Sequence, residues 1–492
     1  MTKESNNTIQ TFWIMMGSLA SFGFTIVSSM ILSRYFLKDE YGTYKQVIYV
    51  YNSLTIAFTL GVPKAFSYFL PRFDKEEAKT IINKLNSILF LNGALFGIVI
   101  YFLSEYISKF LGNEELKDLL KIFSVVPILM LPTMGLDGIL STYRKTKFLA
   151  VYNILSKVFM LLCVVLPVIL FKGTVKHAII GFSFASLINF IVAIYFKNLP
   201  LKGYVKRSTN LSYKDIFSYT LPIMGASIWG VIISSTDQFF ISRYYGNEIF
   251  AEFSNGSIEL PFISMIISAS SVVLYPIFSK KVFENKSSSN NEILGIWHSV
   301  FRKSAMLVYP ILIYFFCFSD LIVVFLYGDT YRASSIYFQI KLIASFFNLI
   351  AYGPLMLTIG GEKHYFRVHM ISAILLVALD FLSVHLTKSP VLISVISCLS
   401  QIGRIIAILI FISNYFKVSL KDLFPVKLIF DLAIPALSVL LLFRYIMNFT
   451  KLENYIVIII GSVFYFIFFL FWSRYRNIDY LSLVKPLMKK YR

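Results

Sequence analysis

Charged side chains lie inside or at the ends of several apolar segments of this 492-residue chain. They are Arg34, Lys45, Lys64, Asp237, Arg243, Glu259 and Arg404. A charge in hydrocarbon costs at least about 2.5–3.5 kcal/mol, so each one needs a partner, a water-filled cavity or a route to the lipid headgroups. Lysine and arginine in a cavity can neutralise a phosphate, and a carboxylate there can carry a proton. We therefore treat these residues as candidates for lining a substrate cavity.

The two acidic candidates have structural as well as functional interpretations. Asp237 belongs to the polar run 234–238, which either lines a cavity or closes on itself as a hydrogen-bonded helix-packing cluster. Glu259 lies in the eighth predicted span, where we expect it to pair with Lys45 or Arg243 or to carry a proton.

The basic candidates differ in their predicted depth. Arg34 and Arg243 end their spans, so snorkelling to the headgroups competes with a role in an outer gate or phosphate site. Lys45 is a candidate cavity cation, whereas Lys64 is either a headgroup anchor or a substrate ligand. Arg404 is mid-span with no easy route to water, so we expect it to face a second pocket in the C-terminal lobe.

Three further charges, Lys157, Lys341 and Asp380, fall on helices that we expect behind the cavity. Pairing of lysine with aspartate inside one lobe is the default expectation there. The 5 histidines are scattered, with no pair at metal-ligand spacing on one helix face, so we expect no metal site.

The composition is that of a membrane protein. Hydrophobic residues make up 57% of the chain and charged residues only 15%, against about 25% charged residues in soluble domains. The net charge of +20 places basic residues in loops that face anionic membrane lipids, and we expect no nucleic acid partner. The sequence lacks the phosphate-binding motif G-x-x-x-x-G-K followed by Ser or Thr, and it has no loop long enough for a catalytic domain. We therefore expect a protein that is not an enzyme and has no cofactor, with transport coupled to a proton or sodium gradient, the membrane potential or the substrate's own gradient.

Apolar stretches of roughly 20 residues predict about 14 membrane-spanning helices. They lie near residues 11–36, 41–70, 81–104, 117–140, 148–171, 175–196, 216–244, 250–279, 295–319, 333–358, 365–387, 390–416, 427–448 and 454–474. Lysine and arginine are concentrated in alternate loops and in the C-terminal tail. The positive-inside rule therefore places both termini of this all-α, multi-pass protein in the cytoplasm.

A segment near the start of the chain recurs in its second half. Leu32–Tyr44 matches Ile241–Phe253 at an offset of 209 positions, and both copies contain Ser-Arg-Tyr at the end of an apolar span. A weaker match joins Phe110–Glu114 to Leu326–Thr330. The repeat covers most of two groups of six helices.

The repeat predicts the domain organisation. We expect two pseudo-symmetric six-helix lobes, 1–210 and 211–416, followed by an additional helix pair and a basic tail at 417–492. Because six is even, the lobes share one topology and are related by an axis along the membrane normal. The first, second, seventh and eighth spans then line a cleft between the lobes, which is typical of a transporter that works by alternating access.

Several short motifs occur in a consistent order along the chain. They are D-E-Y-G-T-Y (Asp39–Tyr44), T-D-Q-F-F-I-S-R-Y-Y-G (Thr236–Gly246) and F-L-Y-G-D-T-Y (Phe325–Tyr331), together with Ser-Arg-Tyr after the first and seventh spans. With this order, the chain resembles the polysaccharide exporters of the multidrug/oligosaccharidyl-lipid/polysaccharide (MOP) superfamily, and among them the Wzx-type O-antigen and repeat-unit flippases. The resemblance covers essentially the whole chain.

The resemblance implies a fold, a substrate and a membrane. The fold is two pseudo-symmetric bundles around a cationic cavity. The substrate is an undecaprenyl-pyrophosphate-linked oligosaccharide for O-antigen, lipopolysaccharide or another surface polysaccharide. It moves from the inner to the outer leaflet of the bacterial cytoplasmic (inner) membrane, and the polysaccharide polymerase and the chain-length machinery are the further partners implied.

Two alternative functions stay open. A cation-coupled multidrug antiporter of the same superfamily predicts a net acidic cleft, whereas the basic candidates here match or exceed Asp237 and Glu259. A membrane-embedded polysaccharide polymerase or glycosyltransferase needs carboxylates or arginines on large outer loops, which the predicted topology lacks. The sequence therefore favours a flippase.

Overall fold

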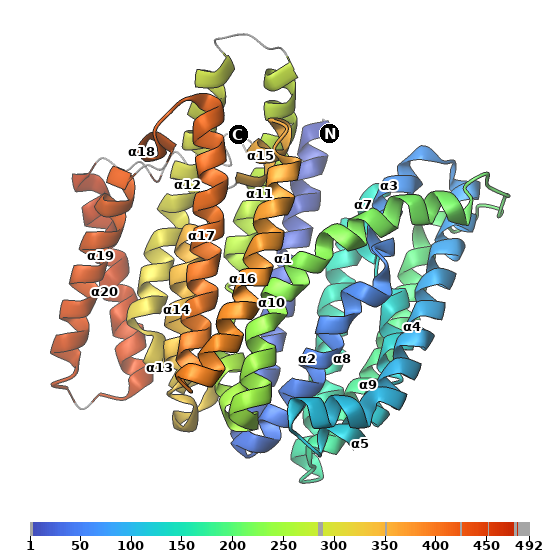
Figure 1. Cartoon of the computed structure of the whole chain (residues 1–492), viewed down its shortest axis with the longest axis horizontal. Coiled ribbons are helices and arrows are strands. Elements are labelled where there is room, and N and C mark those ends of the chain that lie inside the picture. The colour runs from blue at the N-terminus through green and yellow to red at the C-terminus, as the bar shows by residue number, and fades with distance from the viewer. Residues whose placement is uncertain are drawn as a thin grey trace. The chain divides into compact units, whose positions relative to one another are not determined.

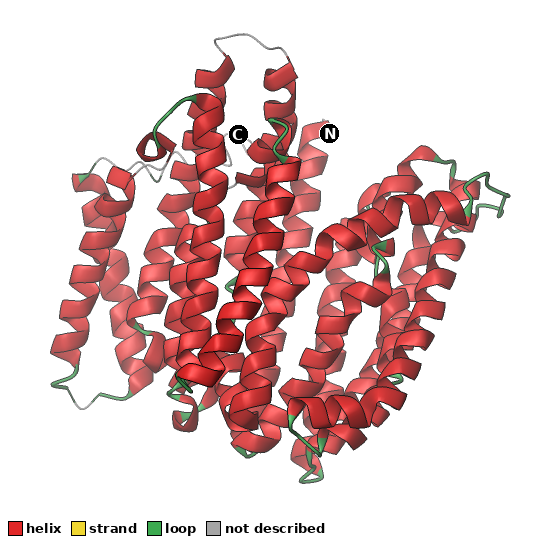
Figure 2. Cartoon of the chain, viewed as in Figure 1, coloured by secondary structure: helices red, strands yellow, loops and turns green. Residues whose placement is uncertain are grey.

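The chain folds mainly into helices. The computed structural model describes residues 3–283, 289–349, 352–423, 426–450, 452–476 and 480, and in these ranges the regular elements are all helices (Figures 1 and 2). Among the described residues, 11 helices are long and apolar enough to cross a membrane, or up to 13 if each bent pair is one span. The predicted all-α polytopic class is therefore confirmed. The sequence predicts about 14 spans, and one of them is 250–279. The helix in this region, α11 (Pro261–Phe283), is not among the 11 spans counted here, and several of its side chains lie outside the described residues.

One compact unit, called unit 1 below, comprises Met1–Ser254 and Asp380–Pro390. Its helices are α1 (Lys3–Tyr35), α2 (Lys38–Thr59), α3 (Val62–Phe69), η1 (Leu70–Arg72), α4 (Lys75–Leu111), α5 (Leu116–Phe123), α6 (Val126–Met130), η2 (Leu131–Thr133), α7 (Leu136–Thr142), α8 (Thr146–Leu170), α9 (Val175–Asn198), η3 (Leu199–Leu201) and nearly all of α10 (Tyr213–Gly256). In this unit α8 packs between α1 and α9, and α4 packs against α5 and α6.

The second compact unit, unit 2, comprises Asn255–Leu379 and Val391–Arg492. Its helices are α11, α12 (Ser289–Cys317), α13 (Ser319–Tyr327), η4 (Asp329–Tyr331), α14 (Ser334–Phe347), α15 (Tyr352–Thr358), most of α16 (Glu362–Leu386), α17 (Pro390–Phe416), α18 (Leu420–Leu423), α19 (Val426–Met447) and α20 (Asn454–Tyr475). Here α12 packs against α19, and α11 against α15. The units are defined by contacts rather than by the sequence repeat, so the lobes 1–210 and 211–416 and the additional helix pair with the tail at 417–492 stay a prediction.

Two predicted spans are bent. The second, 41–70, comprises α2 and α3, which meet at 48°. Leu60 (φ 50) and Gly61 (φ 71) both have left-handed backbone, which ends α2, and Pro63 opens α3 where its missing N–H costs no helical hydrogen bond. The tenth, 333–358, comprises α14 and α15 at 41°. Such breaks are tolerated in a membrane where the freed backbone is buried in protein or lines a cavity.

The two copies of the sequence repeat have the same local structure. α10 consists of two helical segments joined at Gly246, whose φ of 82° and ψ of 177° favour glycine. The repeat alignment places Gly246 on Leu37, which precedes α2 after the end of α1. Each copy is therefore a helix, a break and a second helix.

These copies also pack against each other within unit 1. A methyl group added at Gly42 would lie 2.0 Å from the carbonyl oxygen of Asn247, so only glycine fits at this approach of the two backbones. Beside it, Asn247 Nδ2 donates to Thr43 Oγ1 at 3.2 Å, and Gln46 Nε2 donates to Ser242 Oγ at 2.8 Å. The repeat thus fixes α2 against α10.

Lys197 is a lysine that is fully buried at the end of α9. Its Nζ donates to Asn86 Oδ1 at 2.8 Å and to the Met134 carbonyl at 2.5 Å, and it lies 4.5 Å from the centroid of the Phe66 ring. These contacts satisfy the buried ammonium without a carboxylate at hydrogen-bond distance among the described residues.

Candidate functional site

Lys45 lies inside α2 and is half-buried. Its Nζ donates to Ser29 Oγ at 3.2 Å and lies 5.1 Å from the centroid of the Tyr41 ring. Among the residues that the structure describes, no carboxylate oxygen lies within 4.0 Å of this ammonium. A hydroxyl and a ring face carry only partial negative charge, so the positive charge of Lys45 is left uncompensated.

A buried network of neutral groups holds the helix that carries Lys45. Asn113, in the turn between α4 and α5, donates from Nδ2 to Thr43 Oγ1 at 2.9 Å and to Gln46 Oε1 at 2.5 Å. Gln46 continues the network to α10 through its bond to Ser242. Three segments that are distant in the sequence are therefore linked around α2 by amides and hydroxyls.

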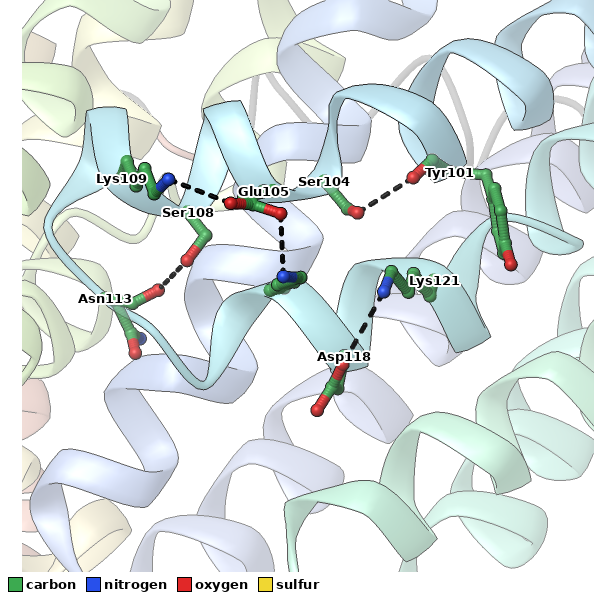
Figure 3. A network of polar contacts seen from close by, with 9 residues as sticks. Tyr101, Ser104, Glu105, Ser108, Lys109, Asn113, Asp118 and Lys121 are labelled. Carbon is green, nitrogen blue, oxygen red and sulfur yellow. Dashed lines mark hydrogen bonds and ion pairs between the residues drawn. The ribbon is translucent and has the colours of Figure 1, made fainter.

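Figure 3 shows how the turn that carries Asn113 is fixed. Glu105, near the end of α4, accepts hydrogen bonds from Lys109 Nζ at 2.8 Å and from Lys117 Nζ of α5 at 2.7 Å. Ser108 Oγ donates to the carbonyl of Asn113 at 2.7 Å. These contacts fix the turn against α4 and α5, while the Asn113 amide donates hydrogen bonds to side chains of α2.

Asp237 lies in α10, and its neighbours in the run 234–238 have mixed surroundings. Thr236 Oγ1 donates to the backbone of its own helix at 2.6 Å. The Ser235 carbonyl instead accepts a hydrogen bond from Tyr49 OH of α2 at 3.3 Å. Asp237 also acts electrostatically on Tyr49, which lies one helical turn from Lys45. The polar run therefore forms part of the α2–α10 contact, and a cavity-lining role for Asp237 stays a prediction.

Asp380 does not form the lysine–aspartate pair expected from the sequence, and that prediction is wrong. Its side chain is fully buried in the part of α16 that belongs to unit 1, and neither carboxylate oxygen has a hydrogen-bond partner among the described residues. Its electrostatic neighbour is Asp237. A buried carboxylate that has no hydrogen-bond partner and lies near a second carboxylate is costly to keep ionised.

The remaining basic candidates of unit 1 are exposed. Arg34 is in the last turn of α1, and Arg243 occupies the equivalent repeat position in α10. Arg243 lies 6.0 Å from the centroid of the Tyr244 ring. Lys64 is exposed in the first turn of α3. Exposure at helix ends suits both headgroup anchoring and substrate binding, so these assignments stay predictions.

Glu259 lies between α10 and α11 rather than inside a helix, and its side chain is 72% exposed. Its Oε1 lies 2.8 Å from Nζ of Lys341 in α14. Glu259 therefore pairs with a lysine of its own unit, and the predicted pairing with Lys45 or Arg243 stays a prediction. The helix break places Glu259 there, because Gly256 packs directly against the backbone of α14 and the following residues are brought beside that helix.

A pocket of about 200 Å³ opens beside this ion pair within unit 2. Its polar lining comprises Glu259, Ser264, Ser268, Lys341, Ser345, Asn348 and Gln401. The lining comes from α11, α14 and α17, and from the break before α11. The sequence alone does not predict this pocket, because its lining residues are far apart in the chain.

Arg404 lies on α17 one helical turn beyond Gln401. Its Nε and Nη1 atoms are buried and have no hydrogen-bond partner among the described residues. Tyr352 and Tyr365 are its electrostatic neighbours. The pocket beside Glu259 is lined by Gln401 and not by Arg404, so the predicted second pocket that faces Arg404 stays a prediction.

Sequence reasoning missed the charged pair that joins the two repeat copies. Lys38, at the start of α2, forms an ion pair with Glu252 near the end of α10. The repeat alignment gives no signal for this pair, because Lys38 aligns with Asn247 and Glu252 with Thr43, and it does not show that the copies touch.

The comparisons with known proteins concern most of the chain. The family described as "Polysaccharide biosynthesis protein" matches residues 9–282, which is more than half of the sequence. An uncharacterized membrane protein of Methanocaldococcus jannaschii, MJ1375, is 26% identical over 285 residues, which cover 55% of this chain and 67% of that protein.

Solved structures resemble the chain in fold. A lipid II flippase MurJ in an inward closed conformation has a TM-score of 0.71 at 17% identity, covering 94% of this chain and 99% of that one. An inward-facing multidrug resistance MATE family transporter of the MOP superfamily has a TM-score of 0.57 at 16% identity, covering 82% and 96%. At these identities the likeness concerns the fold alone.

Proposed function

Because the chain belongs to the polysaccharide biosynthesis protein family, we propose that it is a flippase for undecaprenyl-pyrophosphate-linked oligosaccharide repeat units. It is a multi-pass membrane protein with the fold of MOP superfamily transporters. We assign it to the Wzx-type branch, which moves its substrate from the inner to the outer leaflet of the bacterial cytoplasmic membrane, with both termini in the cytoplasm. Its further partners are anionic lipids, the polysaccharide polymerase and the chain-length machinery.

The observation that carries this proposal is the uncompensated ammonium of Lys45. A pyrophosphate with sugars cannot cross hydrocarbon, whereas its polyprenyl tail can stay there, so a flippase needs a polar path with cations for the phosphates. Lys45 is held at membrane depth by a hydroxyl and an aromatic ring, contacts that leave its charge available to a phosphate. Arg34, Lys64 and Arg243 are exposed cations of the same unit that the sequence also places among the candidates.

The carboxylates Asp237 and Asp380 support coupling to a cation gradient. Both belong to unit 1, and Asp380 is buried without a hydrogen-bond partner among the described residues. A proton or a sodium ion bound between them relieves their repulsion and links substrate movement to the ion gradient. In this proposal the ion gradient supplies the energy through the carboxylate pair, while Lys45 contacts the substrate.

The test is transbilayer movement of a defined lipid in proteoliposomes. The probe is undecaprenyl pyrophosphate carrying a trisaccharide, and a membrane-impermeant sugar-oxidising reagent reports which leaflet holds the sugars. We expect protein-dependent movement that an imposed proton or sodium gradient accelerates. If the protein instead exports a lipophilic cation and leaves the lipid in its leaflet, the multidrug antiporter is the correct function.

A further inference from the structure

We propose that the pocket of unit 2 beside Glu259 and Lys341 binds a sugar ring of the transported glycan, an inference that rests on the proposed flippase function. The site is separate in kind from that of Lys45, because its cation is neutralised by a carboxylate 2.8 Å away. A neutralised pair has little net attraction for phosphate but presents one strong acceptor and one strong donor. Hydroxyl groups, which both donate and accept, match such a pair.

The exposure of the pair shows that it faces the pocket rather than the protein interior. The side chain of Glu259 is 72% exposed and that of Lys341 is 31% exposed, and both line the pocket. A salt bridge that only held two helices together would gain no stability from an exposed carboxylate. The remaining oxygens of Glu259 and protons of Lys341 are therefore accessible to a ligand.

The rest of the lining supplies further hydrogen-bonding groups. The side-chain amides of Asn348 and Gln401 line the pocket and make no hydrogen bond to another described residue. Ser268 is exposed on α11 on the same wall. Leu260 and Ile263 add apolar surface. A sugar ring has hydroxyls at its edge and C–H groups on its faces, so this mixture of polar and apolar groups suits it.

The helical backbone is interrupted twice around the pocket. α10 ends at Gly256 and α11 begins at Pro261, and Glu259 lies in the non-helical segment between them. α14 likewise ends at Phe347, immediately before Asn348. In a membrane protein such backbone is tolerated where it lines a polar cavity, and substrate sites of transporters are typically formed by discontinuous helices. The two helix ends meet at one pocket, which supports a ligand site there.

The size of the pocket limits what it can bind. A volume of about 200 Å³ is well below that of a drug-sized site, which is about 300–1,000 Å³, so the pocket accommodates one ring of an oligosaccharide rather than the whole glycan. A polyprenyl tail is excluded on different grounds, since it would bury the charged pair against hydrocarbon.

The experiment measures protection of a reporter thiol in the pocket. Ser268→Cys is introduced into a full-length chain in which Cys163, Cys317 and Cys398 are replaced by alanine, and the protein is placed in nanodiscs. The rate of alkylation is measured with undecaprenyl pyrophosphate alone and with the same lipid carrying neutral or acidic trisaccharides. We expect at least one trisaccharide lipid to slow alkylation by threefold or more, and the lipid without sugars to leave the rate unchanged. Equal rates with all lipids overturn the proposal.

Variants then separate binding from structural support. Glu259→Gln and Lys341→Met are each expected to abolish the sugar-dependent protection while the melting temperature stays unchanged. The matched control is Asp329→Asn, which breaks the exposed Asp329–Arg332 pair of the same unit and should leave protection intact. If protection is lost only in variants whose melting temperature is also lower, the sugar site is contradicted and the pair has a structural role.

The outcome is distinguishable from failure of the proposed function. A protein that moves the trisaccharide lipid in proteoliposomes but shows no sugar-dependent protection overturns the sugar pocket alone. A protein that moves none of these lipids, while its reporter thiol reacts at the same rate with all of them, overturns the flippase proposal as well.

Discussion

Lys45 and Lys341 are both lysines inside the membrane-spanning part of the chain, yet their surroundings differ in charge. Lys45 of unit 1 contacts a hydroxyl and a tyrosine ring, whereas Lys341 of unit 2 contacts the carboxylate of Glu259. The first site therefore retains a positive charge, and the second is a neutral pair that lines a polar pocket. Under the proposed flippase function, the site of Lys45 neutralises phosphate and the pocket beside Lys341 recognises sugar hydroxyls.

The change with the largest expected effect is Gly42→Ala, which acts on the support of Lys45. The added methyl would lie 2.0 Å from the Asn247 carbonyl oxygen, so α2 must move away from α10. Overpacking of this kind costs about 1–3 kcal/mol, and the shift carries Lys45 with it. We expect a lower melting temperature and loss of most lipid movement in proteoliposomes.

Gly23→Ala is the matched control for Gly42→Ala. A methyl group at Gly23 of α1 meets no atom within 4 Å, and alanine favours a helix over glycine by about 1 kcal/mol. We expect unchanged or slightly raised stability and normal transport. If both variants behave alike, the packing of the two repeat copies does not support the site.

The next effect tests the charge of Lys45 directly. A hydrogen bond to a charged group contributes about 1.5–3 kcal/mol, so Lys45→Met should lower the rate of lipid movement about 10- to 100-fold in a protein of normal abundance. Lys45→Arg keeps the charge and should retain most of the rate. A Lys45→Met protein with a normal rate would show that the uncompensated ammonium is not the phosphate ligand.

Asp380→Asn tests whether coupling to an ion gradient in unit 1 is separate from substrate binding by Lys45. The amide removes the repulsion with Asp237 and cannot take up a proton, so the variant should no longer respond to an imposed proton or sodium gradient. We expect a severalfold loss of the gradient-driven rate, while movement without a gradient changes little. Rates measured with and without the gradient in the same proteoliposomes decide the matter, and a full response of the variant would exclude this aspartate from coupling.

The outcome for single residues shows which features a sequence encodes locally. Apolar length and the repeat predicted the helical membrane fold, because each span carries its own hydrophobic signal. The repeat also placed Arg34 and Arg243 at equivalent helix ends. The partners of Glu259 and Asp380 could not be predicted, because they depend on a helix break before Pro261 and on packing between residues more than a hundred positions apart. The identity of an ion-pair partner inside a membrane depends on how the helices pack. The composition shows only that a buried charge needs a partner.

Lys64→Ala should give the smallest effect, and it asks how far the positive site of unit 1 extends beyond Lys45. Lys64 is exposed in the first turn of α3, after the bend that ends α2. A headgroup anchor there contributes little to the transport step, because an exposed lysine can exchange one phosphate for another in anionic lipid. We expect less than a twofold change in lipid movement in liposomes of both neutral and anionic lipid. A tenfold loss in both, with unchanged abundance, would place Lys64 beside Lys45 as a second phosphate ligand and would make unit 1 a two-cation site, as a pyrophosphate with its two adjacent phosphates favours.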